Sequence, residues 1–290
     1  MERRRWVLIA VGGAFLVFLV WFLYMNFTGK MIVDPFIIKF GRFGIKWYSV
    51  LIASGILIDY IIAKRYFKKR GWRPEELDEA LLLGVVLGII FARAYYVIFQ
   101  WDYFKDHPDE IYKTWHGGIA IHGGILGAIL AVWLYTRKKR SFTFLEGLDV
   151  ASWLFPLAQG IGRWGNFFNH EAYGAPTNLP WKMFVPFAYR MPGYENYSYF
   201  HPTFLYESIW DISSFILLSF YVKNSYKKPG EVTALYLVLY SLGRIMVEGL
   251  RLDSLYFGHI RVAQLFSAIA MVIGGVWYLK LVGKDEALSS

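Results

Sequence analysis

Long apolar blocks alternate with short polar segments along the whole chain. Each block can cross the hydrocarbon core of a bilayer as a helix, which takes about 20 mostly apolar residues. The blocks lie near residues 6–25, 46–64, 78–99, 118–136, 147–168, 203–222, 231–250 and 259–282. The pattern predicts an all-α integral membrane protein, a polytopic helical bundle of about eight transmembrane helices.

The basic residues indicate how these helices are oriented. They cluster between the apolar blocks, as the positive-inside rule expects of cytoplasmic loops, at residues 3–5, 64–73, 137–140 and 223–228. With these loops inside, both termini are cytoplasmic and every other connection faces out. The longest outer segment, 169–202, is rich in proline and aromatic residues, and we expect it to form a small external cap.

The first apolar block has two interpretations. It follows "MERRR" and could be a signal peptide, but its apolar core is long and no small-residue cleavage pattern follows it. We therefore expect residues 1–30 to be a retained extra N-terminal anchor, and residues 31–290 to form the main membrane domain.

Composition narrows the possible functions. Only 18% of the 290 residues are charged, against about 25% in soluble domains. The net charge of +9 is carried mainly by the loop clusters, which favours membrane topology over nucleic-acid binding. No cysteine is present, which excludes disulfides, thiolate ligands and a cysteine nucleophile in this chain. No HExxH motif occurs, so we expect no metal and no cofactor.

Polar residues of six predicted spans share one depth, in the outer half of the membrane. At about 1.5 Å per helical residue, this layer contains Tyr48, Arg93, His122, Arg163, His201, Tyr206, Glu207, Arg244, Glu248 and Arg251. Charged groups at such depth are costly and usually mark a function or a buried pair. A shared depth predicts one polar chamber rather than scattered structural pairs.

The residue types in this layer suggest its ligand. Tyr240, Arg244, Glu248 and Arg251 follow at intervals of four, four and three, so they share one helix face. Glu248 could act in the site or simply neutralise an arginine. Arginine's planar fork suits phosphate, so the chamber predicts an anionic ligand with an apolar body, such as a phospholipid. Glycines flank Arg163 and His122, where they could serve helix packing or ligand contact.

Four motifs together carry a resemblance to a known family. "HGGILG" at 122–127, "GRWGNFFNHEAYG" at 162–174, "HPTFLYE" at 201–207 and "GRIMVEGLR" at 243–251 resemble the bacterial prolipoprotein diacylglyceryl transferases. The resemblance begins near Asp34 and implies a seven-helix core, to which residues 1–30 add one helix.

This resemblance implies a reaction and a location. The diacylglyceryl group of phosphatidylglycerol would pass to the lipobox cysteine thiol of a preprolipoprotein signal peptide. A thioether would form and glycerol 1-phosphate would leave, as a step in lipoprotein maturation. The site would face the outer side of the bacterial cytoplasmic (inner) membrane.

The resemblance also assigns residues. It implies that His122, Arg163 and Arg244 are catalytic, with His122 either a general base or an orienting group. The implied substrate-binding residues are Tyr48, Arg93, Asn166, Glu171, Gly174, His201, Tyr206, Tyr240, Glu248 and Arg251. Glu171 either orders the loop that admits the peptide or is a solvated surface carboxylate.

A different class of protein would share some of these features. A non-enzymatic transporter of anionic lipids or solutes would also have a polar chamber and basic loops. The polar residues do not continue into the inner halves of the spans, which favours the enzyme. A phosphatidyl-alcohol phosphotransferase lacks support because none of the predicted spans contains its Asp-x-x-x-Asp metal motif.

Overall fold

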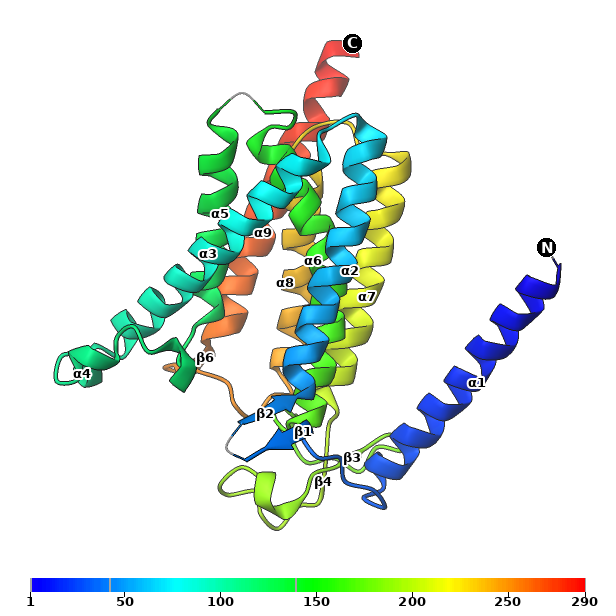
Figure 1. Ribbon diagram of the computed structural model, residues 1–290, viewed down its shortest axis with the longest axis vertical. Coiled ribbons are helices and arrows are strands. Elements are labelled where there is room, and N and C mark those ends of the chain that lie inside the picture. Colours follow the sequence, from blue (N-terminus) through cyan, green and yellow to red (C-terminus); the bar gives the residue numbers. More distant parts are fainter. Residues whose placement is uncertain (1, 42, 139, 290) are drawn as a thin grey trace. The chain divides into compact units, whose positions relative to one another are not determined.

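The computed structural model describes residues 2–41, 43–138 and 140–289, and helices dominate it (Figure 1). The long helices of this part of the chain are α1 (Glu2–Phe27), α2 (Trp47–Arg70), α3 (Pro74–Phe99), α5 (Ile121–Thr136), α6 (Phe144–Phe168), α7 (Thr203–Asn224), α8 (Glu231–Glu248) and α9 (Val262–Ser289). Each overlaps one of the apolar blocks, so the prediction of a mostly helical protein is confirmed.

Short elements occupy the connections. Residues 36–46 form the antiparallel pair β1 (Phe36–Phe40) and β2 (Phe43–Lys46), and α4 (Trp101–Phe104) follows α3. Two further antiparallel pairs are β3 (Met183–Phe184) with β4 (Tyr199–Phe200), and β5 (Tyr256–Phe257) with β6 (Ile260–Arg261). Single 3-10 turns lie at Pro108–Glu110, Thr114–His116 and Phe187–Tyr189.

Some of the helices are suited to a bilayer by length and composition alone. Among the described residues, the four stretches long and apolar enough to cross a membrane are Ala10–Phe27, Trp47–Arg70, Pro74–Phe99 and Val262–Gly283. Helix α5 is apolar but shorter, and α6, α7 and α8 carry more polar side chains. These properties are typical of a helical membrane protein.

The chain divides into two compact units. The first unit comprises Met1–Ile56, Pro156–Ile216 and Leu237–Ile273, and the second comprises Leu57–Phe155, Leu217–Tyr236 and Gly274–Ser290.

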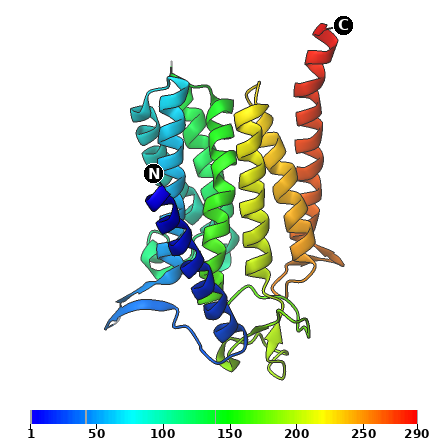
Figure 2. The same cartoon turned by 90° about the vertical axis from the view of Figure 1, so that its right-hand side faces the viewer.

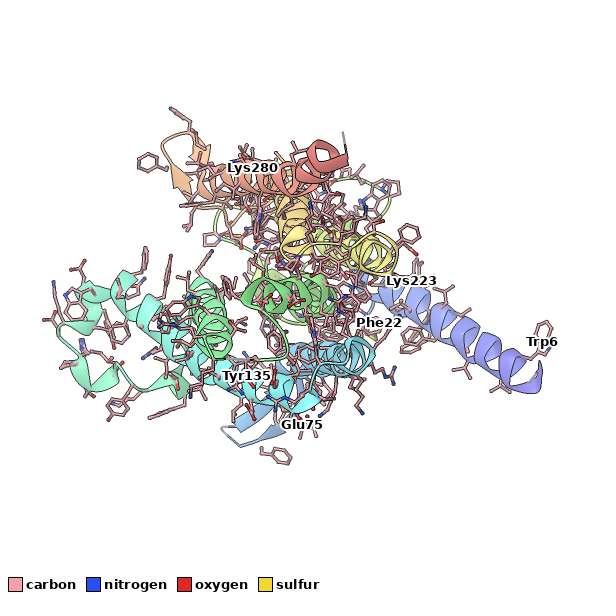
Figure 3. All side chains as sticks on the ribbon, turned by 90° about the horizontal axis from the view of Figure 1, so that it is seen from above. Trp6, Phe22, Glu75, Tyr135, Lys223 and Lys280 are labelled. Carbon is pink, nitrogen blue, oxygen red and sulfur yellow. The ribbon has the colours of Figure 1, made fainter. Side chains whose placement is uncertain are left out.

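An aromatic cluster forms the core of the first unit. Its buried members are Phe167, Tyr173, Met183, Val185, Phe200 and Phe204, from α6, α7 and the 169–202 segment. The carboxyl end of α1 packs there too, with the Phe22 ring 6.0 Å from the Phe167 ring. Trp6, by contrast, is 67% exposed at the far end of α1, away from Phe22 (Figure 3). The segment 169–202 is therefore folded onto helix ends rather than into a separate domain.

Close packing of α3 against α5 organises the second unit. A Cβ atom at Gly123 would lie 2.2 Å from the Phe91 carbonyl oxygen, and one at Gly127 would lie 2.4 Å from the Leu87 carbonyl oxygen. Only glycine permits helix backbones to approach this closely. These two glycines of the "HGGILG" motif therefore serve helix packing.

A buried carboxylate determines where α8 begins. Asp149 of α6 accepts hydrogen bonds from the Thr233 amide (2.8 Å) and hydroxyl (2.7 Å) and from the Gly230 amide (2.6 Å). The Tyr226 hydroxyl donates a further bond at 3.0 Å. Amides in the first turn of a helix have no partner within the helix, so Asp149 caps α8 and ties it to α6.

We expect Gly127→Ala to weaken the fold. The added methyl group has no room against the α3 backbone, and overpacking of this kind costs about 1–3 kcal/mol in free energy of unfolding. Gly124→Ala is the matched control, because its Cβ would come no closer than 3.8 Å to the Gly88 oxygen. Thermal unfolding in detergent micelles measures the stability of both variants and of the wild type. Equal stability of the two would contradict this account of α3–α5 packing.

Candidate active site

Three arginines of the first unit surround one buried carboxylate, that of Glu207 on α7. Arg163 of α6 places its Nε 3.2 Å from Glu207 Oε2. Glu207 Oε1 lies 3.1 Å from Nη1 of Arg244 on α8 and 3.5 Å from Nη1 of Arg251, just beyond α8. The three helices that carry these residues lie side by side in green, yellow and gold (Figure 2). Glu207 is thus the common counter-charge of residues far apart in the sequence.

Further carboxylates complete the charge balance. Glu248 Oε2 lies 2.7 Å from Arg244 Nη2. The carboxylate of Asp253 accepts two hydrogen bonds from Arg251, from Nε at 2.9 Å and from Nη2 at 2.6 Å. Asp211 Oδ2 lies 4.0 Å from Arg163 Nε. Glu248 thus neutralises one arginine of its own helix, while the partners of Arg251, Glu207 and Asp253, lie outside α8. Buried guanidinium groups require such partners because an unpaired buried charge is very costly.

A small cleft opens at the centre of this cluster. It is lined by Gln159, Arg163, Glu207, Trp210, Asp211, Tyr240, Gly243 and Arg244. Within the described ranges, Nη1 and Nη2 of Arg163 make no hydrogen bond to protein, and this side chain is 19% exposed. The fork of Arg163 is therefore free to bind an anion from the cleft.

Tight helix contacts bring the charged residues together. The Trp210 ring of α7 lies directly on Gly243 of α8, where a Cβ would be 2.2 Å from Trp210 Cδ1. Its Nε1 donates to the Leu239 carbonyl at 2.8 Å. On the other side of α7, the Ser208 hydroxyl donates to the Gly160 carbonyl of α6 at 2.8 Å. These contacts hold α7 against both neighbours and so place Glu207 between Arg163 and Arg244.

The turn after α6 is organised by Glu171. Its Oε1 accepts hydrogen bonds from the side-chain amides of Asn166 (3.0 Å) and Asn169 (3.1 Å). The flanking residues His170 and Ala172 both have a φ of 55°, the left-handed region that non-glycine residues rarely adopt. Glu171 is exposed, yet these bonds support its predicted role in ordering the loop.

Tyr48 and Gly174 make close contacts in the same unit. The Tyr48 ring lies on Gly165, where a Cβ would be 2.3 Å from Tyr48 Cδ2. Gly174 donates its amide to the His201 carbonyl at 2.9 Å, and a Cβ there would lie 2.9 Å from the Leu250 oxygen. Gly174 thus links the 169–202 segment to the chain after α8.

His201 and Tyr206 form a small network of their own. The Trp181 indole donates to the Tyr206 oxygen at 2.7 Å, and the Tyr206 hydroxyl lies 3.2 Å from His201 Nδ1. Burial lowers the pKa of His201, which favours a neutral ring that accepts this bond. This contact lies at the start of α7, where Tyr206 directly precedes Glu207.

The remaining predicted site residues, Arg93 and His122, belong to the second unit. Arg93 donates to the carbonyl oxygens of Glu110 (2.6 Å), Ile111 (2.8 Å) and Gly118 (2.7 Å), and so orders the segment before α5. His122 lies exposed in the first turn of α5, its ring 5.9 Å from that of Tyr95. A single chamber shared with the first unit stays a prediction.

The sequence placed Glu207 in the polar layer but assigned it no part in the site, and Asp211 and Gln159 were not identified from it. A signal was present: Glu207 and Asp211 are four residues apart on α7, as are Gln159 and Arg163 on α6, so each pair shares a helix face. In the part of the chain that the structure describes, no group of three or more His, Asp or Glu side chains could hold a metal ion.

We expect Glu207→Gln to destabilise the protein strongly. It leaves three arginines short of a buried counter-charge, and breaking a buried ion pair costs about 3–5 kcal/mol in free energy of unfolding. Asp102→Asn, where a fully exposed carboxylate pairs with Lys105, is the control and should change little. Thermal unfolding in micelles tests this, and an unchanged melting temperature of Glu207→Gln would contradict the role of Glu207.

We also expect stability to fall in mild acid through His170. Its Nε2 lies 3.0 Å from the Val33 carbonyl oxygen, and burial lowers the pKa of the imidazole below its usual value. The neutral ring is therefore favoured in the folded state, so stability is lost as pH falls below about 6.5, the unfolded value. Melting temperatures between pH 8 and 5 measure the effect. His170→Gln should reduce this dependence; the same slope in both proteins would refute it.

Comparison with known proteins shows the family to which this chain is similar. Residues 35–280 match the family described as prolipoprotein diacylglyceryl transferase. A Fervidobacterium nodosum protein named phosphatidylglycerol–prolipoprotein diacylglyceryl transferase is 52% identical over 96% of this chain and 94% of its own. A protein of the same name from Thermotoga maritima is 51% identical over 97% of this chain and 96% of its own. Another, from Gloeobacter violaceus, is 46% identical over 87% of this chain and 95% of its own.

The family match includes the whole arginine cluster, with Arg163, Glu207, Arg244 and Arg251 all inside the matched residues. It also covers both units and most of the helices. The chain therefore belongs to the prolipoprotein diacylglyceryl transferase family.

Proposed function

We propose that this protein transfers the diacylglyceryl group of phosphatidylglycerol to the lipobox cysteine of preprolipoprotein signal peptides. The product is a thioether, glycerol 1-phosphate leaves, and the reaction is a step in lipoprotein maturation. The observation that carries this proposal is the free guanidinium fork of Arg163 in a cleft shared with Arg244. The names of the relatives supply the two substrates.

The two arginines would hold the phosphate and stabilise its developing charge. The thiolate sulfur attacks the carbon of the diacylglyceryl group that bears the phosphate. A carbon–sulfur bond forms, and the bond between that carbon and the phosphate oxygen breaks. The electron pair of that bond leaves on the phosphate, which gains negative charge. Arg163 and Arg244 are already held in place by Glu207, and each preorganised donor of this kind contributes about 3–4 kcal/mol to the transition state.

A proton must leave the thiol before or during attack, because a free thiol has a pKa near 8.5. The chain contains no cysteine, so the thiol is the peptide's. His122 is the proposed base, with orientation of a headgroup hydroxyl as its other possible role.

The other assigned residues support binding in two ways. Tyr240 lines the cleft directly, while Glu248 and Arg251 hold the arginine cluster together. The remaining substrate-binding residues would shape the approach to the site through the contacts described above, and they are Tyr48, Arg93, Asn166, Glu171, Gly174, His201 and Tyr206.

The proposed topology follows the basic loops. All eight long helices would cross the bacterial cytoplasmic membrane, with both termini inside and the active site toward the outer face. Residues 169–202 would form the external cap, and nucleic acid would not bind. Residues 1–30 would be an anchor added to the core of residues 31–290. The Fervidobacterium nodosum alignment covers 96% of this chain and so reaches into this anchor.

The reaction can be tested by peptide mass. Purified protein is incubated with phosphatidylglycerol, a chelator and a lipobox peptide with one cysteine. We expect the peptide to gain one diacylglyceryl unit, and a peptide with serine in place of cysteine to gain none. An unchanged mass, with a known transferase active alongside, would contradict the proposal.

Substitution of Arg163 tests the proposed phosphate contact. We expect Arg163→Ala to lower the rate about 100-fold or more, and Arg163→Lys to recover little because lysine lacks the planar fork. Exposed Arg65 provides the control, and Arg65→Ala should act like the wild type. Melting temperatures confirm that each variant is folded. A folded Arg163→Ala protein with the wild-type rate would contradict the assignment.

A further inference from the structure

Three buried acceptor atoms of residues that line the active-site cleft accept no hydrogen bond within the described ranges. One of them, Oε2 of Glu207, is ion-paired with Arg163 at 3.2 Å. The other two are Oδ2 of Asp211 and Oε1 of Gln159. Both residues line the cleft with Arg163. Asp211 is only 6% exposed, and its Oδ2 lies 4.0 Å from Arg163 Nε. Buried acceptors normally have hydrogen-bond donors, so we expect a bound ligand to supply the donors for these two atoms.

The charges beside these atoms limit what that ligand can be. The free fork of Arg163 demands an anionic group, whereas Asp211 and Gln159 demand hydrogen-bond donors. An ammonium group is disfavoured by Arg163 and Arg244, and a second anionic group is disfavoured by Asp211. An uncharged hydroxyl next to a phosphate satisfies every group in the cleft.

We propose that Asp211 and Gln159 form a subsite for the hydroxyl groups of a polyol phosphate headgroup, here the glycerol headgroup of phosphatidylglycerol. This inference rests on the proposed function and deepens it, because it assigns the selection of the lipid donor to these two residues. The headgroup keeps all its bonds in the reaction and departs with the phosphate. Asp211 and Gln159 thus bind the leaving group by hydrogen bonds and take no part in bond making.

A lipid that lacks only the hydroxyls tests the subsite. Phosphatidylpropanol has the same phosphodiester charge and the same chain length as phosphatidylglycerol. A site that hydrogen-bonds a hydroxyl to a charged acceptor discriminates against its absence by about 10- to 100-fold. We expect wild-type kcat/KM to favour phosphatidylglycerol by about this factor.

The variants assign this preference to residues. Asp211→Asn and Gln159→Leu should each reduce the preference about tenfold, with the loss falling mainly on phosphatidylglycerol. Gln159→Leu leaves the ion pairs of the cleft intact, so this variant still tests the subsite if Asp211→Asn fails to fold. Ser213, exposed on α7 outside the cleft, provides the control, and Ser213→Ala should keep the full preference.

The outcomes separate this inference from the function beneath it. A wild-type protein that uses both lipids equally, or a Gln159→Leu protein with the full preference, would overturn the subsite while the transferase function stands. A wild-type protein that transfers from neither lipid would contradict the proposed function and, with it, this inference.

Discussion

The ion pairs around Glu207 are the constraint on which the arrangement of the active site depends. One carboxylate faces Arg163 on one side and Arg244 and Arg251 on the other. A guanidinium removed from water is tolerable only beside a compensating charge. Helices α6 and α8 therefore meet at α7, and small residues such as Gly160 and Gly243 let them approach it closely.

The same pairs leave the cluster prepared for an anion. Glu207 engages Arg163 through Nε, so the two terminal nitrogens of this cleft residue stay available for a ligand. Arg244 is held at both terminal nitrogens, by Glu207 and Glu248, and contributes a positive charge in a fixed position. A site built in this way need not rearrange when charge develops on a bound phosphate, which is where preorganised electrostatics lower a barrier most.

The helices and part of the site could be predicted from sequence, because both depend on local patterns. Apolar blocks located every long helix, and spacing placed Arg244 and Glu248 on one face, where they pair. The role of Glu207 could not be predicted in this way, since its partners lie on other helices. Arg93 looked like a ligand for an anion, yet its donors bind carbonyl oxygens, and no pattern in the sequence distinguishes these uses. The left-handed backbone at His170 and Ala172 was equally hidden, because neither is glycine.

Binding of the lipid phosphate by Arg163 and Arg244, held in place by Glu207, is the step on which the proposed function depends. The most direct test is an experimental structure of the protein with a non-reactive phosphatidylglycerol analogue in which carbon replaces the scissile oxygen. We expect the phosphate to lie in the cleft between α6, α7 and α8, with its oxygens within hydrogen-bond distance of the terminal nitrogens of Arg163. A phosphate bound elsewhere, with the Arg163 fork still free, would contradict this assignment.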